Sequence, residues 1–204
     1  MAENYLLSSA YFPPVSYISL IHRADKIFIE REENYLKQTY RNRCKILTAN
    51  GLSILTVPVL AGASNKTCIE DIKIDYSKRW QQVHLRALIS AYRSSVFFEY
   101  FFDIVEKLIN DKEEYLLDLN MKSLEIVLKI LRILTPVEYT NSFEPVKGNK
   151  NDFRYSISPK KEANGASSLV AYYQVFEKRY GFVPDLSVLD LIFNTGPDSI
   201  DYLT

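Results

Sequence analysis

Gln38-Thr39-Tyr40-Arg41-Asn42-Arg43 leads directly into two short runs typical of β-strands, Lys45-Ile46-Leu47-Thr48 and Ser53-Ile54-Leu55-Thr56-Val57. Ala49-Asn50-Gly51 separates the two runs. Asn-Gly is the strongest short hairpin signal, because a type I′ turn needs positive φ at both central residues. We therefore predict an antiparallel hairpin over residues 43–58 that turns at Asn50-Gly51. Such a rigid support often carries functional groups, so the polar residues at its start are candidates for a site.

The chain before the hairpin predicts a βαβ unit. Tyr5-Leu6-Leu7 favours a first strand that ends before Pro13-Pro14, because proline cannot donate to a strand ladder. Residues 15–24 have helical spacing, and residues 26–30 favour a second strand. Strand, helix and strand in this order indicate a parallel pair with a right-handed crossover. The expected class is α/β, with a central mixed sheet from the N-terminal third (βαβ plus hairpin) covered by helices.

The middle of the chain predicts one more strand and three helices. Residues 69–74 favour a strand, and Ser77 is a suitable N-cap for a helix that runs to about residue 94. Residues 96–109 form a second, very aromatic helical region. The clearest amphipathic helix is expected over residues 121–134, with a buried stripe at Leu124, Val127, Leu128, Leu131 and Leu134.

Residues 138–168 differ in composition, being rich in Lys, Asn, Ser, Gly and Glu. We expect a loop or insertion there within a single domain spanning residues 1–204, with a short extended piece at residues 153–157. Because such a segment has few apolar anchors, its amide protons should exchange faster than those of the helix at residues 121–134. Order should return near Tyr172, and residues 186–193 carry an apolar helical face.

Composition narrows the function classes. The 204 residues include 25 Lys plus Arg and 25 Asp plus Glu, so the formal net charge is zero. This balance argues against broad electrostatic attachment to nucleic acid. The start of the chain has no signal-peptide pattern, and no apolar run is long enough for a membrane span. Cys44 and Cys68 lack a paired framework, so we expect reduced core thiols in a cytoplasmic protein.

The stretch before the hairpin supplies the first candidate site residues. Arg41 and Arg43 would point to opposite faces of an extended segment, and an arginine fork matches carboxylate or phosphate. Thr39 and Asn42 suit hydroxyl-bearing ligands. The structural alternative is that the two arginines flank an edge strand and that Thr39 and Asn42 cap turns.

The end of the chain supplies the second candidate group. Ser187 and Asp190 have capping-box spacing, and Asp185 and Asp190 could both lie near a helix N-terminus. The functional alternative makes one of the two aspartates a base or a hydroxyl-binding carboxylate. Asn194-Thr195-Gly196-Pro197 would offer backbone N–H groups at a helix start, which is a potential anion seat.

The histidines and glycines exclude several common sites. His84 falls beside Trp80 on an apolar helical side, so we expect a core histidine with one hydrogen bond, whereas His22 should lie on the surface. No local spacing provides a metal-ligand set, and neither standard Gly-rich phosphate loop is present. We therefore expect no metal site, and the sequence identifies no cofactor.

Three segments together resemble the WbqC-like protein family. They are Tyr11-x-Pro13, then Gln38-x-x-Arg41-Asn42-Arg43, then Asp190-Leu191-Ile192-Phe193-Asn194-x-Gly196-Pro197. Many family members read His-Gln-Pro-x-Tyr-x-Pro near the start, but here the stretch is Leu7-Ser8-Ser9-Ala10-Tyr11-Phe12-Pro13. If that histidine is catalytic in other members, this chain lacks the activity or performs it differently.

The resemblance implies a role in bacterial surface-polysaccharide or O-antigen synthesis. Our first hypothesis is a cytoplasmic transferase that moves an acyl or aminoacyl group onto a nucleotide-activated sugar. The alternative is a non-catalytic binding or scaffold protein in the same pathway. A deep cleft lined by the candidate residues would favour the enzyme, and a shallow exposed aromatic patch would favour the scaffold.

The enzyme hypothesis requires distant residues to converge. Tyr11, Arg41, Asn42 and Asp190 should come together, either around a ligand or through an Arg41–Asp190 ion pair that pins the last helix to the sheet. The full set of expected substrate-binding residues is Tyr11, Thr39, Arg41, Asn42, Asp190, Asn194 and Gly196.

Overall fold

The computed structural model describes residues 3–63, 65–145, 150–159 and 169–203. Its strands are β1 (Asn4–Ser8), β2 (Lys26–Glu30), β3 (Arg43–Thr48), β4 (Gly51–Thr56) and β5 (Val137–Tyr139). Its α-helices are α1 (Val15–Arg23), α2 (Trp80–Tyr92), α3 (Phe98–Asn110), α4 (Leu116–Leu131), α5 (Glu177–Tyr180) and α6 (Val188–Thr195). Two 3₁₀ helices are described, η1 (Ile69–Asp71) and η3 (Gly196–Tyr202).

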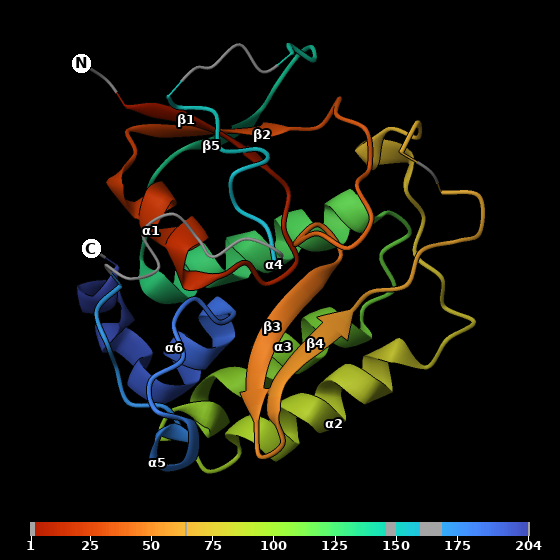
Figure 1. Cartoon of the computed structure of the whole chain (residues 1–204). Coiled ribbons are helices and arrows are strands. Elements are labelled where there is room, and N and C mark those ends of the chain that lie inside the picture. Colours follow the sequence, from red (N-terminus) through yellow and green to blue (C-terminus); the bar gives the residue numbers. More distant parts are fainter. Residues whose placement is uncertain (1–2, 64, 146–149, 160–168, 204) are drawn as a thin grey trace.

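The predicted βαβ unit is confirmed. β1 and β2 are parallel with α1 between them in sequence, and β5 adds to β2 as a second parallel neighbour. The α/β class is therefore as expected, but the strands form two sheets instead of one. The order β1-β2-β5 makes the first sheet, and the hairpin β3-β4 makes the second. In Figure 1 the parallel sheet lies at the top, the hairpin lies lower and in front, and α4 crosses between them.

The hairpin forms where the Asn-Gly signal placed it, but its turn differs from the predicted type. Thr48 pairs with Gly51, so Ala49 and Asn50 are the two turn residues. Of the three residues after Thr48, Gly51 alone has positive φ (100°). A type I′ turn would need positive φ at both central residues, so that assignment was wrong. A glycine with positive φ directly after the turn instead matches the common turn-plus-bulge connection.

Three expected elements are corrected. Residues 69–74 are a 3₁₀ turn (Ile69–Asp71) followed by isolated bridges, because Lys73 and Ile74 pair singly with Tyr115 and Val59. Ser77 does not cap α2, which begins at Trp80; the Ser77 N–H and hydroxyl both donate to Asp75. The amphipathic helix runs from Leu116 to Leu131 and ends at Arg132 in the left-handed conformation, so Leu134 lies outside it and is 92% exposed.

The described parts of residues 138–168 are mostly irregular. The expected extended piece at residues 153–157 is instead a turn. This turn is nevertheless anchored to the sheet, since Leu6 N–H donates to Asn151 O and Phe153 N–H donates to Leu6 O. Residues 146–149 and 160–168 lie outside the described residues, and the expectation of an insertion with fast amide exchange stays a prediction.

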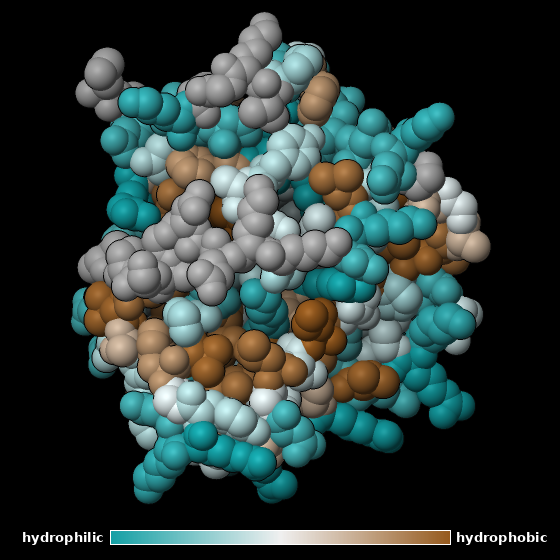
Figure 2. Space-filling view, viewed as in Figure 1, coloured by the Kyte–Doolittle hydropathy of each residue, from teal (hydrophilic) through white to brown (hydrophobic). Residues whose placement is uncertain are grey.

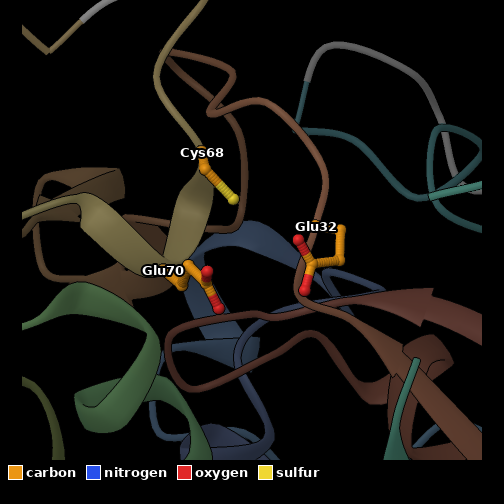
Figure 3. Close-up of side chains that lie close together, drawn as sticks. All are labelled: Glu32, Cys68 and Glu70. Carbon is orange, nitrogen blue, oxygen red and sulfur yellow. The ribbon is translucent and has the colours of Figure 1, made fainter. Parts of the chain in front are cut away.

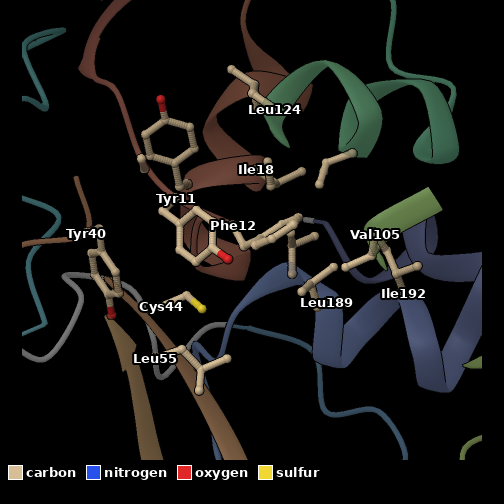
Figure 4. Packing of buried hydrophobic residues seen from close by; sticks show 14 of the residues in the cluster. Tyr11, Phe12, Ile18, Tyr40, Cys44, Leu55, Val105, Leu124, Leu189 and Ile192 are labelled. Atoms are coloured by element: carbon tan, nitrogen blue, oxygen red, sulfur yellow. The ribbon is translucent and has the colours of Figure 1, made fainter. Parts of the chain in front are cut away.

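The core joins both sheets and the last helix. Figure 4 shows Tyr11 and Phe12 packed between the hairpin, which contributes Cys44 and Leu55, and the α6 residues Leu189 and Ile192. Cys44 is buried as predicted, whereas Cys68 is half-buried, and both are free thiols. Apolar side chains also gather on the face seen in Figure 2, and Leu52 and Ile54 of β4 are exposed because they share the outer side of the hairpin.

Candidate functional site

The candidate site lies at the carboxyl ends of two neighbouring parallel strands. β1 ends at Ser8 and β2 ends at Glu30, and these two residues are partners in the strand register. Both are buried, Ser8 at 7% exposed and Glu30 at 0% exposed. In open α/β sheets, ligands bind outside the carboxyl ends of the strands. This edge therefore has the position that ligand sites commonly occupy in such sheets.

An arginine–glutamate pair forms the centre of the site. Arg41 Nε donates to Glu33 Oε1 at 2.7 Å, and Arg41 Nη2 donates to Glu33 Oε2 at 2.5 Å. Arg41 Nη2 also donates to Ser8 Oγ at 2.6 Å, while the Ser8 hydroxyl lies 3.0 Å from Glu33 Oε2 as a donor. Arg41 is 3% exposed and Glu33 is 0% exposed. The pair is a bidentate fork held away from water, with a serine hydroxyl against it.

Burial decides the protonation behaviour of Glu33. Loss of solvation raises the pKa of its carboxyl group, and the hydrogen bonds and charge of Arg41 oppose that rise. A carboxyl group with a raised pKa, next to a hydroxyl group, has the character of a general acid or base.

A second arginine lies beside the first. Arg154, which is 2% exposed, donates to Glu30 Oε2 at 2.9 Å and to Asp152 Oδ2 at 2.6 Å. The Tyr155 ring centroid lies 5.7 Å from the Arg41 guanidinium carbon and 5.9 Å from that of Arg154. Tyr155 therefore makes cation–π contacts with both arginines.

We refer to six of these residues as the carboxyl-edge cluster: Ser8, Glu30, Glu33, Arg41, Asp152 and Arg154. Three of the six are acids and two are arginines, so the cluster has one formal negative charge in excess when all are ionised. A small cavity adjoins it, lined by Ser8, Ser9, Tyr17, Tyr40, Arg41 and Arg154 among others. The cavity has a volume of about 10 Å³, which is room for about one water-sized group.

Thr39 belongs to the same network. Its hydroxyl accepts a hydrogen bond from Arg41 Nη1 at 3.3 Å and donates to Leu36 O at 2.8 Å. Arg43, in contrast, is half-buried and does not line the small cavity, so the two arginines differ in environment as their alternation predicted.

Tyr11 and Asn42 lie close to the site in the chain but have other partners. The Tyr11 hydroxyl lies 3.0 Å from Nδ1 of His84, whose Nε2 lies 3.2 Å from Thr56 O. Because a carbonyl oxygen can only accept, Nε2 carries the proton and Tyr11 donates to Nδ1. His84 is 2% exposed, so the predicted core histidine is confirmed, with two partners instead of one. Asn42 Nδ2 donates to Val57 O at 3.0 Å, which fixes the end of the hairpin.

Asp190 has partners in the C-terminal segment. Its Oδ1 accepts from the Tyr172 hydroxyl at 2.9 Å and from Gln174 Nε2 at 3.2 Å. Burial raises the pKa of Asp190 to about 6, and these hydrogen bonds oppose the rise. The proposed Arg41–Asp190 ion pair is therefore wrong, because Glu33 already holds the arginine fork.

The capping predictions at the end of the chain hold in part. The Ser187 hydroxyl accepts from Leu189 N–H at the start of α6, but Asp190 does not close a capping box. Asp185 caps a different helix, since its Oδ1 accepts from Ser16 N–H in α1 at 2.9 Å. Carboxylates and hydroxyls commonly satisfy these unpaired N–H groups at helix starts.

Asn194 and Gly196 have contacts within the fold. Asn194 Nδ2 donates to Asp190 O at 2.7 Å, one turn earlier in α6. Gly196 has φ of 57°, and a Cβ atom there would lie 2.5 Å from the Phe97 ring. Glycine is therefore required at this position for both its backbone conformation and its lack of a side chain.

The backbone segments that carry the predicted residues do meet, although the side chains form separate networks. Tyr11 N–H donates to Tyr40 O, Val188 N–H donates to Pro13 O, and Ser187 N–H donates to Lys45 O. The cavity lined by Arg41 does not include Tyr11, Asn42 or Asp190. The start, the hairpin and the end of the chain are thus held side by side.

A cluster separate from the carboxyl-edge cluster combines sulfur and carboxylate groups. Glu32, Cys68 and Glu70 present atoms that lie within 4.8 Å of one another (Figure 3). Arg31 Nε lies 3.3 Å from Glu32 Oε1 and 4.0 Å from Glu70 Oε2, so the two carboxylates share a cation. Cys68 donates to Arg31 O, and burial raises the pKa of its thiol. We interpret this cluster as an ion-pair network and assign no metal to it.

Sequence reasoning missed most of the carboxyl-edge cluster. Glu30 is the last residue of the predicted second strand, and Ser8 directly follows the predicted Tyr5-Leu6-Leu7, so the strand-end rule could have found both. Glu33 and Arg154 carried no local signal, because one lies in a connecting loop and the other in the segment expected to be an insertion.

Comparison with known proteins agrees with the resemblance. Residues 8–169 match the WbqC-like protein family. An uncharacterised protein of Mycobacterium tuberculosis is 26% identical over 227 aligned positions, which span 100% of this chain and 98% of that protein. No solved structure matches significantly. The family match includes the whole carboxyl-edge cluster but stops before Asp190.

Proposed function

The chain belongs to the WbqC-like protein family, and from this premise we propose that it is an enzyme of bacterial surface-polysaccharide synthesis. It acts in the cytoplasm and transfers an acyl or aminoacyl group to a nucleotide-activated sugar. The observation that carries the proposal is the carboxyl-edge cluster. Two buried arginines, each paired with carboxylates, lie at the ends of neighbouring parallel strands beside a serine hydroxyl.

The energetics of the cluster support a functional role. Transferring charged groups from water into a protein costs several kcal/mol per ion, and apolar residues often replace buried ion pairs without loss of stability. Arg41 and Arg154 are nevertheless both buried with carboxylate partners. In the proposal, the cluster preorganises cationic forks for phosphate or carboxylate groups, at the edge where open α/β sheets bind ligands.

Named residues then have distinct roles. Glu33 accepts the proton that the sugar hydroxyl or amino group loses as it bonds to the acyl carbon, while the bond from that carbon to the donor's leaving group breaks. Burial raises the pKa of Glu33, which makes its carboxylate a better proton acceptor. Ser8 lies between Glu33 and the small cavity and can pass the proton by its hydroxyl. Arg41 and Thr39 contact the anionic and hydroxyl groups of the substrate.

The other predicted residues belong to the fold around the site. Each fixes a separate part of the fold: Tyr11 contacts His84, Asn42 contacts Val57, Asp190 contacts Tyr172 and Gln174, Asn194 contacts the Asp190 carbonyl group, and Gly196 packs against Phe97. Their proposed contribution is to position Arg41 and the strand ends. Direct substrate contact by these five residues stays a prediction.

A thermal-shift screen tests the proposal. A panel of nucleoside diphosphate sugars, with free nucleotides and free sugars as separate arms, is added to the wild-type protein. A ligand present at 100 times its dissociation constant stabilises the native state by about 2.7 kcal/mol. We expect a nucleotide sugar to raise the melting temperature of the wild type. The rise should be smaller in Arg41→Lys, which keeps the charge but loses the fork.

The matched control is Arg86→Lys, because Arg86 is exposed on α2. It should bind as the wild type does. The proposal fails if no nucleotide sugar stabilises the wild type, or if Arg41→Lys and Arg86→Lys retain the same shift. A shift that requires only the free nucleotide would move the specificity away from the sugar.

A second candidate function is a binding or scaffold protein of the same pathway. The observation in its favour is that all three nitrogens of the Arg41 guanidinium already have partners within the chain. On this alternative the cluster is a structural clasp that anchors residues 151–155 to the sheet. Arg41→Lys would then lower the melting temperature, and no member of the panel would bind.

A further inference from the structure

The outer face of α4 carries four charged residues in a regular stripe. Asp118, Lys122, Glu125 and Lys129 are exposed, and their spacing of four, three and four residues places them on one side of the helix. The sequence of charges is acid, lysine, acid, lysine. We call these four residues the α4 stripe.

Apolar grooves flank the α4 stripe on both sides. One groove, of about 870 Å³, has Met121, Leu128, Ile133 and Leu134 among its lining residues. The other, of about 280 Å³, lies between α4 and α3. Leu134 is 92% exposed, and Tyr139 on the same flank is 39% exposed. An isolated solvated helix face would have no such apolar borders.

The stripe charges have few partners within the chain. Lys122 pairs with Glu113. Among the described residues, no ion pair within 4.0 Å involves Asp118, Glu125 or Lys129, although acid-to-lysine spacings of four residues are available. The ordinary interpretation is a solvated face with weak pairs along the helix. The order of the charges also matches the stripe of a second copy in the opposite direction.

The stripe is complementary to itself under a two-fold rotation. An axis midway between Lys122 and Glu125 reverses the helix direction and places Asp118 opposite Lys129 of a second copy. The same rotation places Lys122 opposite Glu125. Every stripe residue therefore meets an opposite charge, and each contact occurs twice, as a symmetric dimer interface requires.

We propose that α4 is the self-association surface of this protein and that its occupant is a second copy of the chain. The two α4 helices pack antiparallel. The larger apolar groove of each copy meets the same groove of the other, because the rotation brings equivalent flanks together. The apolar flanks supply most of the affinity, since exposed ion pairs are individually weak, and the charges fix the orientation. This proposal does not depend on the proposed enzymatic function.

Charge reversal with rescue tests the proposal by sedimentation equilibrium over a wide range of protein concentration. The wild type should dimerise. Lys129→Glu converts two attractive contacts into two repulsive ones, and we expect the dimer to weaken about tenfold, or about 1.4 kcal/mol. The double variant Asp118→Lys with Lys129→Glu exchanges the charges and should restore the wild-type constant.

Two further variants separate the surface from general effects. Lys178→Glu makes the same charge change on α5, where Lys178 is exposed, and should leave the dimer unchanged. Leu134→Ser removes an exposed apolar side chain from the groove and should weaken the dimer without changing the unfolding midpoint of the monomer. A wild-type protein that stays monomeric at every concentration would overturn the proposal. So would equal behaviour of Lys129→Glu and Lys178→Glu, or failure of the exchanged pair to restore association.

Discussion

Replacing Arg41 with methionine tests the energetic interpretation of the carboxyl-edge cluster. The substitution leaves the Glu33 carboxylate at 0% exposure without its cation, and Ser8 loses a donor. Removing one partner of a buried ion pair costs about 3–5 kcal/mol. Stabilities of globular domains are about 5–15 kcal/mol, so the variant should fold but be clearly destabilised.

A double variant measures the interaction energy between Arg41 and Glu33 separately from the rest of the site. Replacing Glu33 with methionine in the Arg41→Met background removes the uncompensated charge, and apolar replacement of a whole buried pair is often neutral. We therefore expect the double variant to be more stable than Arg41→Met alone, with a coupling energy of about 3 kcal/mol. Urea unfolding can be followed by the fluorescence of Trp80, the single tryptophan, which is 4% exposed.

The stability lost in Arg41→Met should depend on pH in a definite direction. Arg41 lowers the pKa of Glu33, so its removal lets burial raise that pKa further. A carboxyl group with a raised native pKa favours folding at low pH and loses that contribution as pH rises. The loss of stability in Arg41→Met should therefore be smaller at pH 5 than at pH 8. The reasoning is refuted if Arg41→Met costs no more than the exposed control Arg86→Met, or if the two substitutions in the double variant are additive.

Three further predictions concern single residues. Asp190 has a native pKa of about 6 against an ordinary 3.8, so stability should fall as pH rises from about 4 to 6, by up to about 3 kcal/mol, and Asp190→Asn should abolish this decline in urea titrations. His84 has the opposite sign: burial lowers its pKa to about 4 from 6.5, so stability should fall as pH drops through this window, by up to about 3 kcal/mol, and His84→Gln should flatten that part of the curve. Gly196→Ala should cost about 2–4 kcal/mol, because it combines a positive φ of 57° with a Cβ atom 2.5 Å from the Phe97 ring. Gly62→Ala, with φ of 97° and no atom within 4 Å of the added Cβ, is the matched control and should show the smaller backbone cost alone.

Local patterns predicted the elements whose cause is local. The Asn50-Gly51 pair marked the hairpin, since glycine tolerates the positive φ that its connection needs. Pro14 lies at the N-cap of α1, and the apolar period located the core of α4. The errors had two causes, a competing local hydrogen bond and a missing long-range partner. Ser77 bonds Asp75 instead of capping α2, and residues 69–74 lack the continuous neighbouring strand that would make them a strand.

The candidate site likewise has features that local sequence predicts and features that depend on the tertiary structure. The sequence by itself determined the family, the α/β class, and the presence of polar residues at the hairpin start, because these depend on residue identity and short spacing. Only the tertiary structure decided that Arg41 pairs with Glu33 and not with Asp190, and that Arg154 joins them. A buried charge must find a partner with correct geometry, and that partner depends on which distant segments the fold brings together. Sequence order carries little information about that choice.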